Sequence, residues 1–296
     1  MINKIVVPVA GSGTRFLPLS KAVTKEFLPL GEESLISLLF KEILDSGIQE
    51  TFVVGSSRNK DLFKKLMSED TQLKSKLEKE SKKDVLDKLN KFNNVIEKIS
   101  LKFFLQRRQT GDGGAVLFLQ KYLKDNNFAV AFPDDVIIYQ EPPFVQMMKV
   151  FKNMQRPVIG VFKVPAEKSS NYGVVKVEKI ANRFYKILDI EEKPKEGYEK
   201  EKEVFVIVGR YIFTSDIFEY IKSSKAKHGE LKLAFALKNM IKNGKMVYGY
   251  EIKGDWLECG SKEEYIRSFV RYALKYYEFK DSILKMIKNL NVKNGN

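Results

Sequence analysis

Short apolar runs alternate with longer amphipathic stretches through the first half of the chain. The runs are rich in β-branched residues and predict buried strands: Ile5–Val9, Thr51–Val54, Leu101–Leu105, Phe128–Phe132 and Val158–Phe162. The amphipathic stretches predict helices: Leu35–Asp45, Gly114–Leu123 and Phe144–Asn153. The first helix has Ser34 as a candidate N-cap and Gly47 just beyond its end. This alternation predicts an α/β protein with a doubly wound, mostly parallel sheet covered by helices on both faces.

The segment Asn59–Asn93 interrupts this alternation. It is highly charged, lacks glycine and proline, and carries apolar residues at helical spacing, such as Leu62, Leu66 and Leu73. We expect a helical excursion that packs on the sheet or reaches out to cover a pocket. A merely tolerated insertion is the alternative.

The second half favours antiparallel pairing. Tyr172–Val177 and Phe184–Ile190 predict two strands around a turn at 181–183. Further elements are predicted along the chain: a loop at Glu196–Glu203, a strand at Val204–Phe213, a helix at Leu231–Ile241 and a strand at Met246–Ile252.

The chain is predicted to end in one long helix over Ser261–Leu290. Ser261 and Glu264 form a capping-box pattern. The apolar residues that follow give the helix one face: Ile266, Phe269, Val270, Ala273, Leu274 and Tyr277. This face packs either on the core of its own chain or on a second subunit.

Composition narrows the possible chemistry. The chain of 296 residues is 44% hydrophobic, which is enough for a packed core, and no apolar run has the length of a membrane span. Cys259 and His228 are the only residues of their kinds, so a cysteine-rich metal site is excluded and a serine–histidine triad is disfavoured. We therefore expect a soluble cytoplasmic protein whose catalysis depends on carboxylates, lysines, arginines and backbone amides.

The net charge of +14 favours polyanionic partners. Most lysines are interspersed with acidic residues, as in 74–91, rather than clustered in one basic stripe. This pattern is more typical of a solvated surface around a phosphate-binding cleft than of a nucleic-acid groove. We expect neither nucleic acid nor a membrane as partner.

A glycine turn follows the first predicted strand. Gly11 and Gly13 let backbone N–H groups approach a nucleotide, although tight turns also use glycine for conformational reasons alone. Arg15 and Lys25 follow in the same loop and can bind phosphate oxygens. The pattern differs from a P-loop and from a dinucleotide fingerprint, because it lacks the Gly-Lys-Ser/Thr ending and a third glycine.

Three further motifs lie at strand ends. Asp134 and Asp135 follow the strand at Phe128–Phe132, where carboxylates can bind a magnesium–triphosphate complex or simply begin a turn. Glu192 and Lys193 could contact a sugar hydroxyl and its phosphate, or form an ordinary polar strand end. Gln106, with Gly111 and Gly113 after it, could pair with a base edge, although an exposed loop glutamine is commoner.

The order of these motifs resembles the bacterial UTP–glucose-1-phosphate uridylyltransferases, within the sugar nucleotidyltransferases. The resemblance extends over nearly the whole chain and rests on these segments: 8–15, 21–29, 106–116, 133–135, 172–175, 192–194, 208–211 and 259–261. The charged insert at 59–93 is similar to the one that separates these enzymes from their thymidylyl relatives. The resemblance implies a Rossmann-like doubly wound mixed sheet with a small antiparallel sugar-binding portion and a C-terminal helix.

The resemblance also implies a domain organisation and a reaction. One domain, 1–296, would comprise a nucleotide-binding half (1–163), a sugar-binding half (164–260) and a C-terminal helix and tail (261–296). The enzyme would use Mg²⁺ to make UDP-glucose and pyrophosphate from UTP and glucose 1-phosphate, as a homodimer or homotetramer. The alternatives are a relative that uses another base or sugar, such as dTTP, and a catalytically impaired regulatory homologue.

Residue roles follow from the same resemblance, position by position. Ala10, Gly11 and Gly13, with Gln106 and Gly111, would bind the nucleotide. Gly173, Glu192 and Lys193 would contact the sugar and its phosphate. Arg15, Lys25 and Lys193 would act on the phosphates, and Asp134 and Glu258 would hold the metal ion.

Several positions depart from the family pattern. Glu258 stands in place of an aspartate, Thr24 in place of a proline and Gly114 in place of a histidine. Asp112 replaces an apolar residue, and Ala234-Phe235 replaces a Thr-Asp pair. These departures bear on sugar and base specificity more than on the class of reaction.

Overall fold

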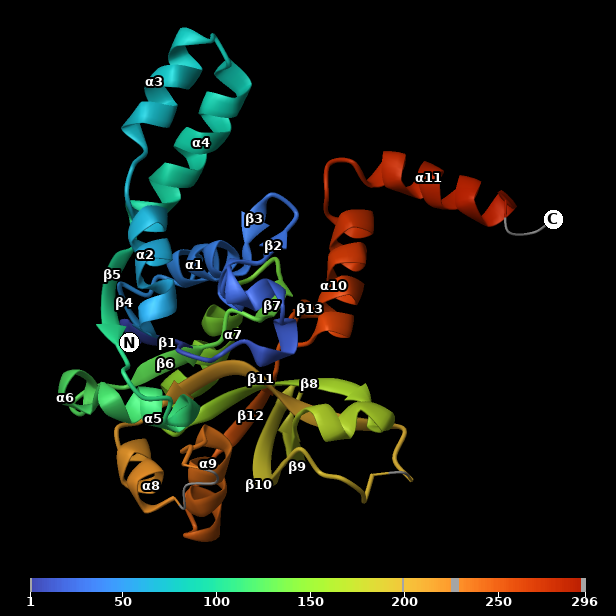
Figure 1. Ribbon diagram of the computed structural model, residues 1–296. Coiled ribbons are helices and arrows are strands. Elements are labelled where there is room, and N and C mark those ends of the chain that lie inside the picture. Colours follow the sequence, from blue (N-terminus) through green and yellow to red (C-terminus); the bar gives the residue numbers. More distant parts are fainter. Residues whose placement is uncertain (1, 199, 225–228, 294–296) are drawn as a thin grey trace.

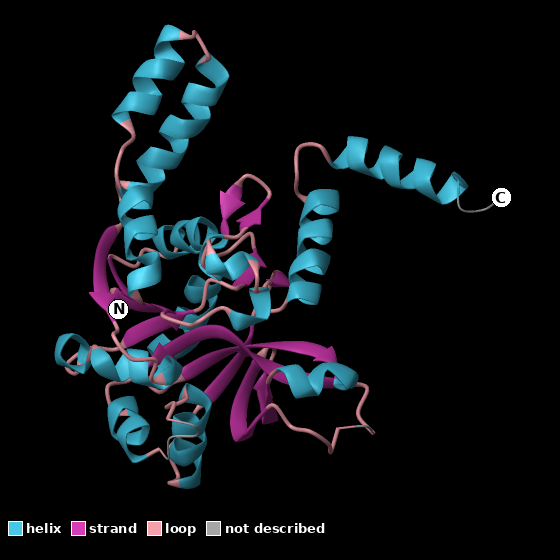
Figure 2. Ribbon diagram, viewed as in Figure 1, coloured by secondary structure: helices cyan, strands magenta, loops and turns pink. Residues whose placement is uncertain are grey.

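The computed structural model describes residues 2–198, 200–224 and 229–293, so His228 lies outside the described residues. Its central feature is a twisted sheet with helices on both faces (Figures 1 and 2). In spatial order its strands are β5 (Ser100–Leu105), β4 (Glu50–Gly55), β1 (Lys4–Val9), β6 (Phe128–Ala131), β11 (Glu203–Phe213), β8 (Val158–Pro165), β12 (Tyr248–Glu251), β10 (Phe184–Glu192) and β9 (Gly173–Ala181). Each predicted strand is present within a few residues of its expected bounds.

The sheet is mixed rather than mostly parallel, which corrects the expectation from the alternating pattern. β5, β4, β1 and β6 are parallel, whereas β11 pairs antiparallel with both β6 and β8. β11 also pairs antiparallel with β9 through Phe205↔Val175 and Val206↔Val174, which curls the second half of the sheet back on itself. The parallel half thus supplies strand ends at one edge, while the curled half forms a separate wall beside them.

The helices cover the two faces because successive strand residues point to opposite sides. On β1, Ile5 and Val7 pack in one core cluster and Val6 in the other. The first cluster contains residues of α1 (Leu35–Asp45), α2 (Ser57–Met67) and α7 (Pro143–Met154). The second contains residues of α5 (Gly111–Phe118), α6 (Gln120–Leu123), α8 (Ile217–Ser223) and α9 (Leu233–Lys242).

Local sequence signals account for the ends of several helices. The Ser34 side chain accepts a hydrogen bond from the backbone N–H of Ser37, so α1 begins where its cap predicts. The helix expected at 114–123 instead begins at Gly111 and is interrupted at Leu119, which separates α5 from α6.

The charged insert forms α2, α3 (Thr71–Lys79) and α4 (Lys83–Ile96). α2 packs on the sheet through Phe63, which is buried. α3 and α4 form a hairpin that points away from the sheet (Figure 1). The predicted helical excursion is confirmed, and within the described structure its outer part extends from the body.

Two small ribbons and several short 3₁₀ helices were not predicted. The ribbons are β2 (Pro29–Leu30) with β3 (Glu33–Ser34), and β7 (Asp135–Ile138) with β13 (Asp255–Glu258). The 3₁₀ helices are η1 (Thr14–Phe16), η2 (Leu19–Lys21), η3 (Lys25–Phe27) and η4 (Ala166–Asn171). Their strands and turns are too short to give a periodic signal in the sequence.

The C-terminal region forms two helices, not one. α10 (Lys262–Lys275) packs over β13, and α11 (Lys280–Lys293) follows after a break and extends away from the body (Figure 1). The expected apolar face is divided, because Ala273 is buried whereas Ile266 and Val270 are 60% and 46% exposed. No helix in the described part of the chain is long and apolar enough to span a membrane.

Candidate functional site

The glycine turn at the carboxyl end of β1 gives its two glycines different roles. Gly13 has a left-handed φ of 65°, and the Ser20 hydroxyl donates a hydrogen bond to its carbonyl over 2.8 Å. Gly11 faces open space, with no atom within 4 Å of the position that a Cβ would occupy. Gly11 therefore leaves room for a ligand to reach the backbone, whereas Gly13 shapes the turn.

A pocket of about 240 Å³ opens beside this turn. It is lined by five of the predicted site residues: Ala10, Gly11, Lys25, Gln106 and Gly111. The other lining residues are Pro8, Ser12, Glu26, Gln109, Asp112, Ala115, Phe132 and Glu230. Residues from β1, from the loop after β5 and from α5 thus meet at one place, as the carboxyl ends of parallel strands are expected to do.

The loop between β5 and α5 is held by close backbone contacts. The Gly113 N–H donates to the Leu231 carbonyl over 3.0 Å, and the Leu231 N–H donates to the Thr110 carbonyl over 2.8 Å. A Cβ on Gly111 would lie 2.3 Å from the Leu231 carbonyl oxygen, so only glycine fits there. The segment before α9 therefore fixes the loop that carries Gln106.

Two departures from the family pattern have a structural reason. The Asp112 carboxylate accepts hydrogen bonds from the N–H groups of Gly113 and Leu233, so it caps the start of α9. Burial raises the pKa of this carboxyl group. A Cβ on Gly114 would lie 2.1 Å from the Thr110 hydroxyl oxygen, which itself accepts from the Gln106 side chain over 3.0 Å. Thr110 thus fills the space of a side chain at position 114.

Two lining residues were not assigned a role from the sequence. Gln109 donates from its side chain to the Ala10 carbonyl over 3.1 Å and closes the pocket between the two loops. Glu26 is 1% exposed, and neither of its carboxylate oxygens has a hydrogen-bond partner among the described residues. Burial raises the pKa of Glu26, and the Lys25 charge opposes that rise. A buried acceptor without a partner is costly unless a ligand donates to it.

Lys25 and Asp134 form an ion pair at the edge of this pocket, with 2.5 Å between Nζ and Oδ2. Burial disfavours the charge on both groups, but their mutual attraction outweighs it. As a result the pKa of Lys25 is raised and the pKa of Asp134 is lowered, and both stay charged. Lys25 therefore links the pocket to the turn formed by Pro133, Asp134 and Asp135 after β6, which we call the acidic turn.

The neighbouring Asp135 has a structural role. One of its carboxylate oxygens accepts from the Trp256 indole over 2.8 Å and the other from the Gly209 N–H over 2.9 Å. Burial, followed by the Asp134 charge, raises the pKa of Asp135 to about 6. Both Asp135 oxygens thus accept hydrogen bonds within the chain, whereas Oδ2 of Asp134 pairs with Lys25.

Glu258 comes next to Asp134 because β13 pairs with β7. The position of a Cβ on Gly260 would lie 3.0 Å from a Glu258 carboxylate oxygen and 3.1 Å from Oδ2 of Asp134. Burial, followed by the charge of Asp135, raises the pKa of Glu258 to about 7. Because Gly260 has no side chain, there is space between the carboxylates of Glu258 and Asp134, and a cation in this space would offset their repulsion.

This donor set fits Mg²⁺. The described residues contain no cluster of three or more His, Cys, Asp or Glu side chains able to hold a metal ion. Mg²⁺ is commonly held by one or two carboxylates and completes its coordination with water and phosphate oxygens. Asp134 and Glu258 supply that number.

The corner predicted to bind sugar is built by the β9–β10 pair. Gly173 lies opposite Glu192 in the register, and its Cβ position would be 3.2 Å from a Glu192 carboxylate oxygen. Lys193 has a left-handed φ of 51°, and its N–H donates to the Tyr172 carbonyl over 2.9 Å. Lys232, which was not predicted as a site residue from the sequence, places its Nζ 3.5 Å from Oε1 of Glu192.

Electrostatic contacts connect this corner to the glycine turn. Burial, followed by the Arg15 charge, lowers the pKa of Lys193, and the charges of Glu192 and then Glu258 oppose this shift. The Arg15 guanidinium donates to the Gly260 carbonyl over 3.3 Å. The structure thus brings together Arg15, Lys25, Asp134, Lys193 and Glu258. Of the five residues predicted to bind the nucleotide, Gly13 is the one that is not among the described residues lining the pocket.

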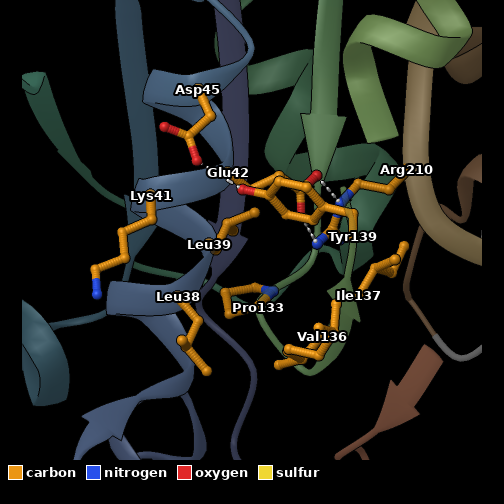
Figure 3. Close-up of a pocket in the computed structure, with 11 residues that line it drawn as sticks. Leu38, Leu39, Lys41, Glu42, Asp45, Pro133, Val136, Ile137, Tyr139 and Arg210 are labelled. Carbon is orange, nitrogen blue, oxygen red and sulfur yellow. Dashed lines mark hydrogen bonds and ion pairs between the residues drawn. The ribbon is translucent and has the colours of Figure 1, made fainter. Parts of the chain in front are cut away.

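A second cavity, of about 290 Å³, lies behind the acidic turn, between α1 and β7 (Figure 3). It is mainly lined by apolar side chains such as Leu38, Leu39 and Val136, with Glu42 and Arg210 at its inner end. None of the predicted site residues is among the described residues that line it. The candidate site is therefore the crevice in front of the turn.

Comparison with known sequences gives a family match over residues 4–274, to the nucleotidyl transferase family. The chain is 31% identical over 290 residues to the UTP–glucose-1-phosphate uridylyltransferase of Staphylococcus haemolyticus, and the match covers 98% of each protein. It is 30% identical over 292 residues to UTP–glucose-1-phosphate uridylyltransferase 2 of Staphylococcus saprophyticus, covering 98% of this chain and 99% of that protein.

Solved structures give the same picture. The UTP-bound UGPase from Acinetobacter baumannii is similar with a TM-score of 0.85 and 27% identity, and the match covers 98% of this chain and 100% of that one. A UDP-glucose pyrophosphorylase complexed with UDP-glucose has a TM-score of 0.80 and 30% identity, covering 93% and 100% of the two chains.

Proposed function

Because the chain belongs to the nucleotidyl transferase family, among the UTP–glucose-1-phosphate uridylyltransferases, we propose that it transfers the uridylyl group of UTP to glucose 1-phosphate and releases pyrophosphate. One observation carries the proposal. Lys25 lines the nucleotide pocket and also pairs with Asp134, so the pocket and the acidic turn open to the same place. Nucleotide and sugar phosphate can therefore meet there.

The nucleoside would bind in the pocket of about 240 Å³. Backbone groups of Ala10 and Gly11 would hold the uracil together with Gln106 and the backbone of Gly111. Glu26 would accept a hydrogen bond from an N–H or O–H of the nucleoside, which would give its buried carboxylate the partner that it otherwise lacks.

The sugar phosphate would bind at the β9–β10 corner. The backbone of Gly173 and the carboxylate of Glu192 would contact the glucose hydroxyls, and Lys193 would bind the phosphate. The lowered pKa of Lys193 reflects burial next to Arg15, and an incoming dianion would relieve the repulsion between these two cations.

The reaction would be an in-line displacement. An oxygen of the sugar phosphate forms a bond to the α-phosphorus of UTP, and the bond from this phosphorus to the oxygen shared with the β-phosphate breaks. A phosphate dianion is already nucleophilic, so no proton acceptor is needed. The protein has to position two polyanions and offset their charge, which Arg15, Lys25 and Lys193 would do.

We propose that Asp134 and Glu258 hold Mg²⁺, which when bound would add positive charge beside the phosphates. Lys25 could then form an ion pair either with Asp134 or with the triphosphate, which are both negatively charged. We further propose that the enzyme acts in the cytoplasm as a homodimer or homotetramer, with the C-terminal helices as a contact between copies.

A matrix of initial rates tests the proposed function. Pyrophosphate release is measured with UTP, dTTP, ATP or GTP against glucose 1-phosphate and other hexose 1-phosphates, with Mg²⁺ or with EDTA. The proposal predicts the highest rate with UTP and glucose 1-phosphate and no turnover in EDTA. A higher rate with another pair would assign another specificity, and absence of turnover with every pair would contradict the enzymatic role.

A further inference from the structure

One sequence motif, Val208–Tyr211, has no part in the proposed reaction, yet it contains Arg210, the largest fully buried side chain among the described residues. Arg210 lies on β11 and is 1% exposed. Its Nε and Nη2 donate to the two carboxylate oxygens of Glu42, each over 2.7 Å (Figure 3). Since Glu42 belongs to α1, this fork joins the sheet to a helix on one of its faces.

The remaining donors of Arg210 reach the acidic turn. Nη1 donates to the Phe132 carbonyl over 3.0 Å and to the Gly209 carbonyl over 2.9 Å, and Nη2 donates to the Asp135 carbonyl over 2.8 Å. A guanidinium has five N–H donors, and the five contacts match that number. The carbonyls of Phe132 and Asp135 stand on either side of Pro133-Asp134. One side chain therefore holds both ends of the turn that carries Asp134.

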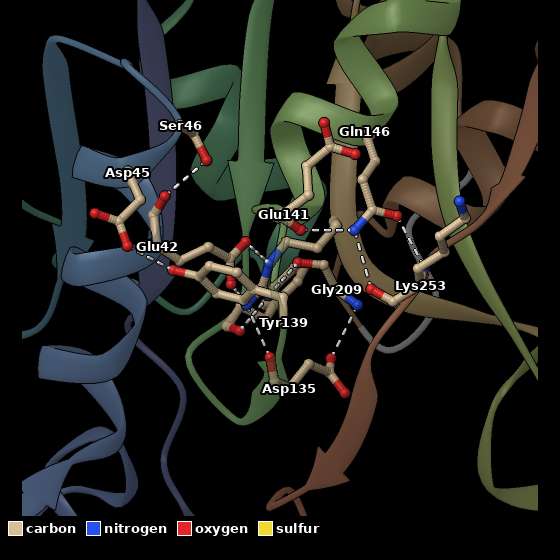
Figure 4. A network of polar contacts seen from close by, with 11 residues as sticks. Glu42, Asp45, Ser46, Asp135, Tyr139, Glu141, Gln146, Gly209 and Lys253 are labelled. Atoms are coloured by element: carbon tan, nitrogen blue, oxygen red, sulfur yellow. Dashed lines mark hydrogen bonds and ion pairs between the residues drawn. The ribbon is translucent and has the colours of Figure 1, made fainter.

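Other contacts around the turn act in the same direction. The Gly209 N–H donates to the Asp135 carboxylate, and the Cys259 N–H donates to the Asp134 carbonyl over 2.7 Å (Figure 4 shows Asp135 and Gly209). Behind the turn, however, lies the cavity of about 290 Å³, which Pro133 and Val136 help to line. The turn faces this cavity on that side, and its hydrogen bonds help to fix its position there.

A buried ion pair is a weak means of stabilising a fold, because apolar residues of similar volume stabilise as well or better. A planar guanidinium is suited to fixing several acceptors at once, which a lysine cannot do. We propose that Arg210, neutralised by Glu42, is a positioning residue that holds Asp134 at the place where it meets Lys25 and Glu258. This inference rests on the proposed function for its kinetic consequence, but not for its structural one.

Two variants test whether Arg210 and Glu42, which we call the clamp, hold the acidic turn in place. Arg210→Lys keeps the positive charge beside Glu42 but loses the fork. The double variant Glu42→Leu/Arg210→Met removes the ion pair and replaces it with apolar volume, so that it folds even if the single variant does not. The matched control is Gln146→Met. Gln146 is also 1% exposed, and its amide bridges the backbone of Glu141 and Lys253 away from the turn (Figure 4).

The first readout needs no substrate. Hydrogen–deuterium exchange of peptides covering 128–138 should become about tenfold faster in both clamp variants, because the turn opens locally. The same peptides should exchange at the wild-type rate in Gln146→Met. Unchanged exchange in the double variant would overturn the proposal, whatever reaction the enzyme carries out.

The second readout is kinetic. In the double variant kcat should fall about 100-fold, because a carboxylate displaced by about 1 Å no longer positions the phosphates. The KM for UTP should change by less than about threefold, because Arg210 hydrogen-bonds to neither Ala10, Gly11 nor Gln106. A kcat near the wild-type value, or an equal loss in Gln146→Met, would overturn the positioning role. If the wild type itself shows no turnover, the proposed function fails while the exchange result still decides on the clamp.

Discussion

Two ion pairs meet the acidic turn from opposite sides, and they are built differently. In front, Lys25 and Asp134 are joined by one contact of 2.5 Å, and their side chains are 24% and 17% exposed. Behind, Arg210 and Glu42 are joined by two contacts of 2.7 Å, and their side chains are 1% and 3% exposed. The front pair opens on the nucleotide pocket, whereas the back pair is enclosed by α1 and the sheet.

The two pairs differ because the charges in front have to change partners when substrate binds, whereas the charges behind have to keep theirs. A charge that binds phosphate has to exchange one partner for another when substrate arrives, so it gains from partial exposure and few contacts. A charge that fixes the backbone gains from burial and from a complete set of hydrogen bonds. We therefore expect changes in front to lower turnover, and changes behind to lower stability as well.

The largest effect is expected for Asp134→Asn in the front pair. The substitution removes the charge of the carboxylate that we propose as a ligand for Mg²⁺ and should lower kcat by about 10³-fold. The free energy of unfolding should change by less than about 1 kcal/mol, because Lys25 is partly exposed and can be solvated. Pyrophosphate release and urea denaturation measure the two quantities. A loss of several kcal/mol would instead make Asp134 a structural residue.

The next effect is expected for Glu42→Gln in the back pair. It leaves the Arg210 guanidinium buried without a counter-charge, which should lower the free energy of unfolding by about 3 kcal/mol. The midpoint of urea denaturation should fall with an unchanged slope. An unchanged midpoint would show that Arg210 does not depend on Glu42 for its charge.

A smaller effect is expected at the rim of the nucleotide pocket. Gly114→Ala places a Cβ about where the Thr110 hydroxyl lies and should displace Thr110 from Gln106. The KM for UTP should rise about tenfold, the equivalent of one hydrogen bond. The double variant Thr110→Gly/Gly114→Ala should recover the packing but not the contact to Gln106. An unchanged KM for UTP in the single variant would show that Gln106 does not bind the base.

The smallest effect on turnover is expected for deletion of residues 280–296. α11 extends from the body, and its side chains Leu284, Met286 and Leu290 are exposed. Turnover per protomer should stay within about twofold, since neither ion pair is touched. Light scattering should give a lower mass if α11 joins copies of the chain as proposed, and an unchanged mass would assign that contact to other elements.

Much of the crevice could be predicted because its residues follow strand ends. Arg15, Lys25 and Asp134 lie after β1 or β6 or in the adjoining loop, and the carboxyl ends of these parallel strands converge. Lys193 follows β10, which pairs antiparallel with both of its neighbours, so this rule does not account for its position. Glu26 was missed because its burial depends on packing that no local pattern indicates. Arg210 was missed as a clamp because its five acceptors come from α1, the turn after β6 and β11, which are distant in the sequence.

The fold, too, could be predicted where a feature has a local sequence signal and not where it depends on distant parts of the chain. Buried strands such as Ile5–Val9 are continuous apolar runs, so both faces of the sheet could be expected to be covered. The antiparallel insertion of β11 between β6 and β8 leaves no local trace, since an isolated strand reads alike in either direction. The break between α10 and α11 was missed because helical spacing continues through Tyr277.

The most direct test of the proposed reaction is the turnover of Lys25→Ala compared with that of Lys41→Ala, with the unfolding midpoint measured for both. Lys41 is a matched control, because it forms an ion pair of the same length, 2.5 Å, with Glu33 away from the pocket. We expect Lys25→Ala to lower kcat by about 10²–10³-fold while the protein stays folded, and Lys41→Ala to leave kcat unchanged. Near-normal turnover in a folded Lys25→Ala protein would contradict the proposed reaction.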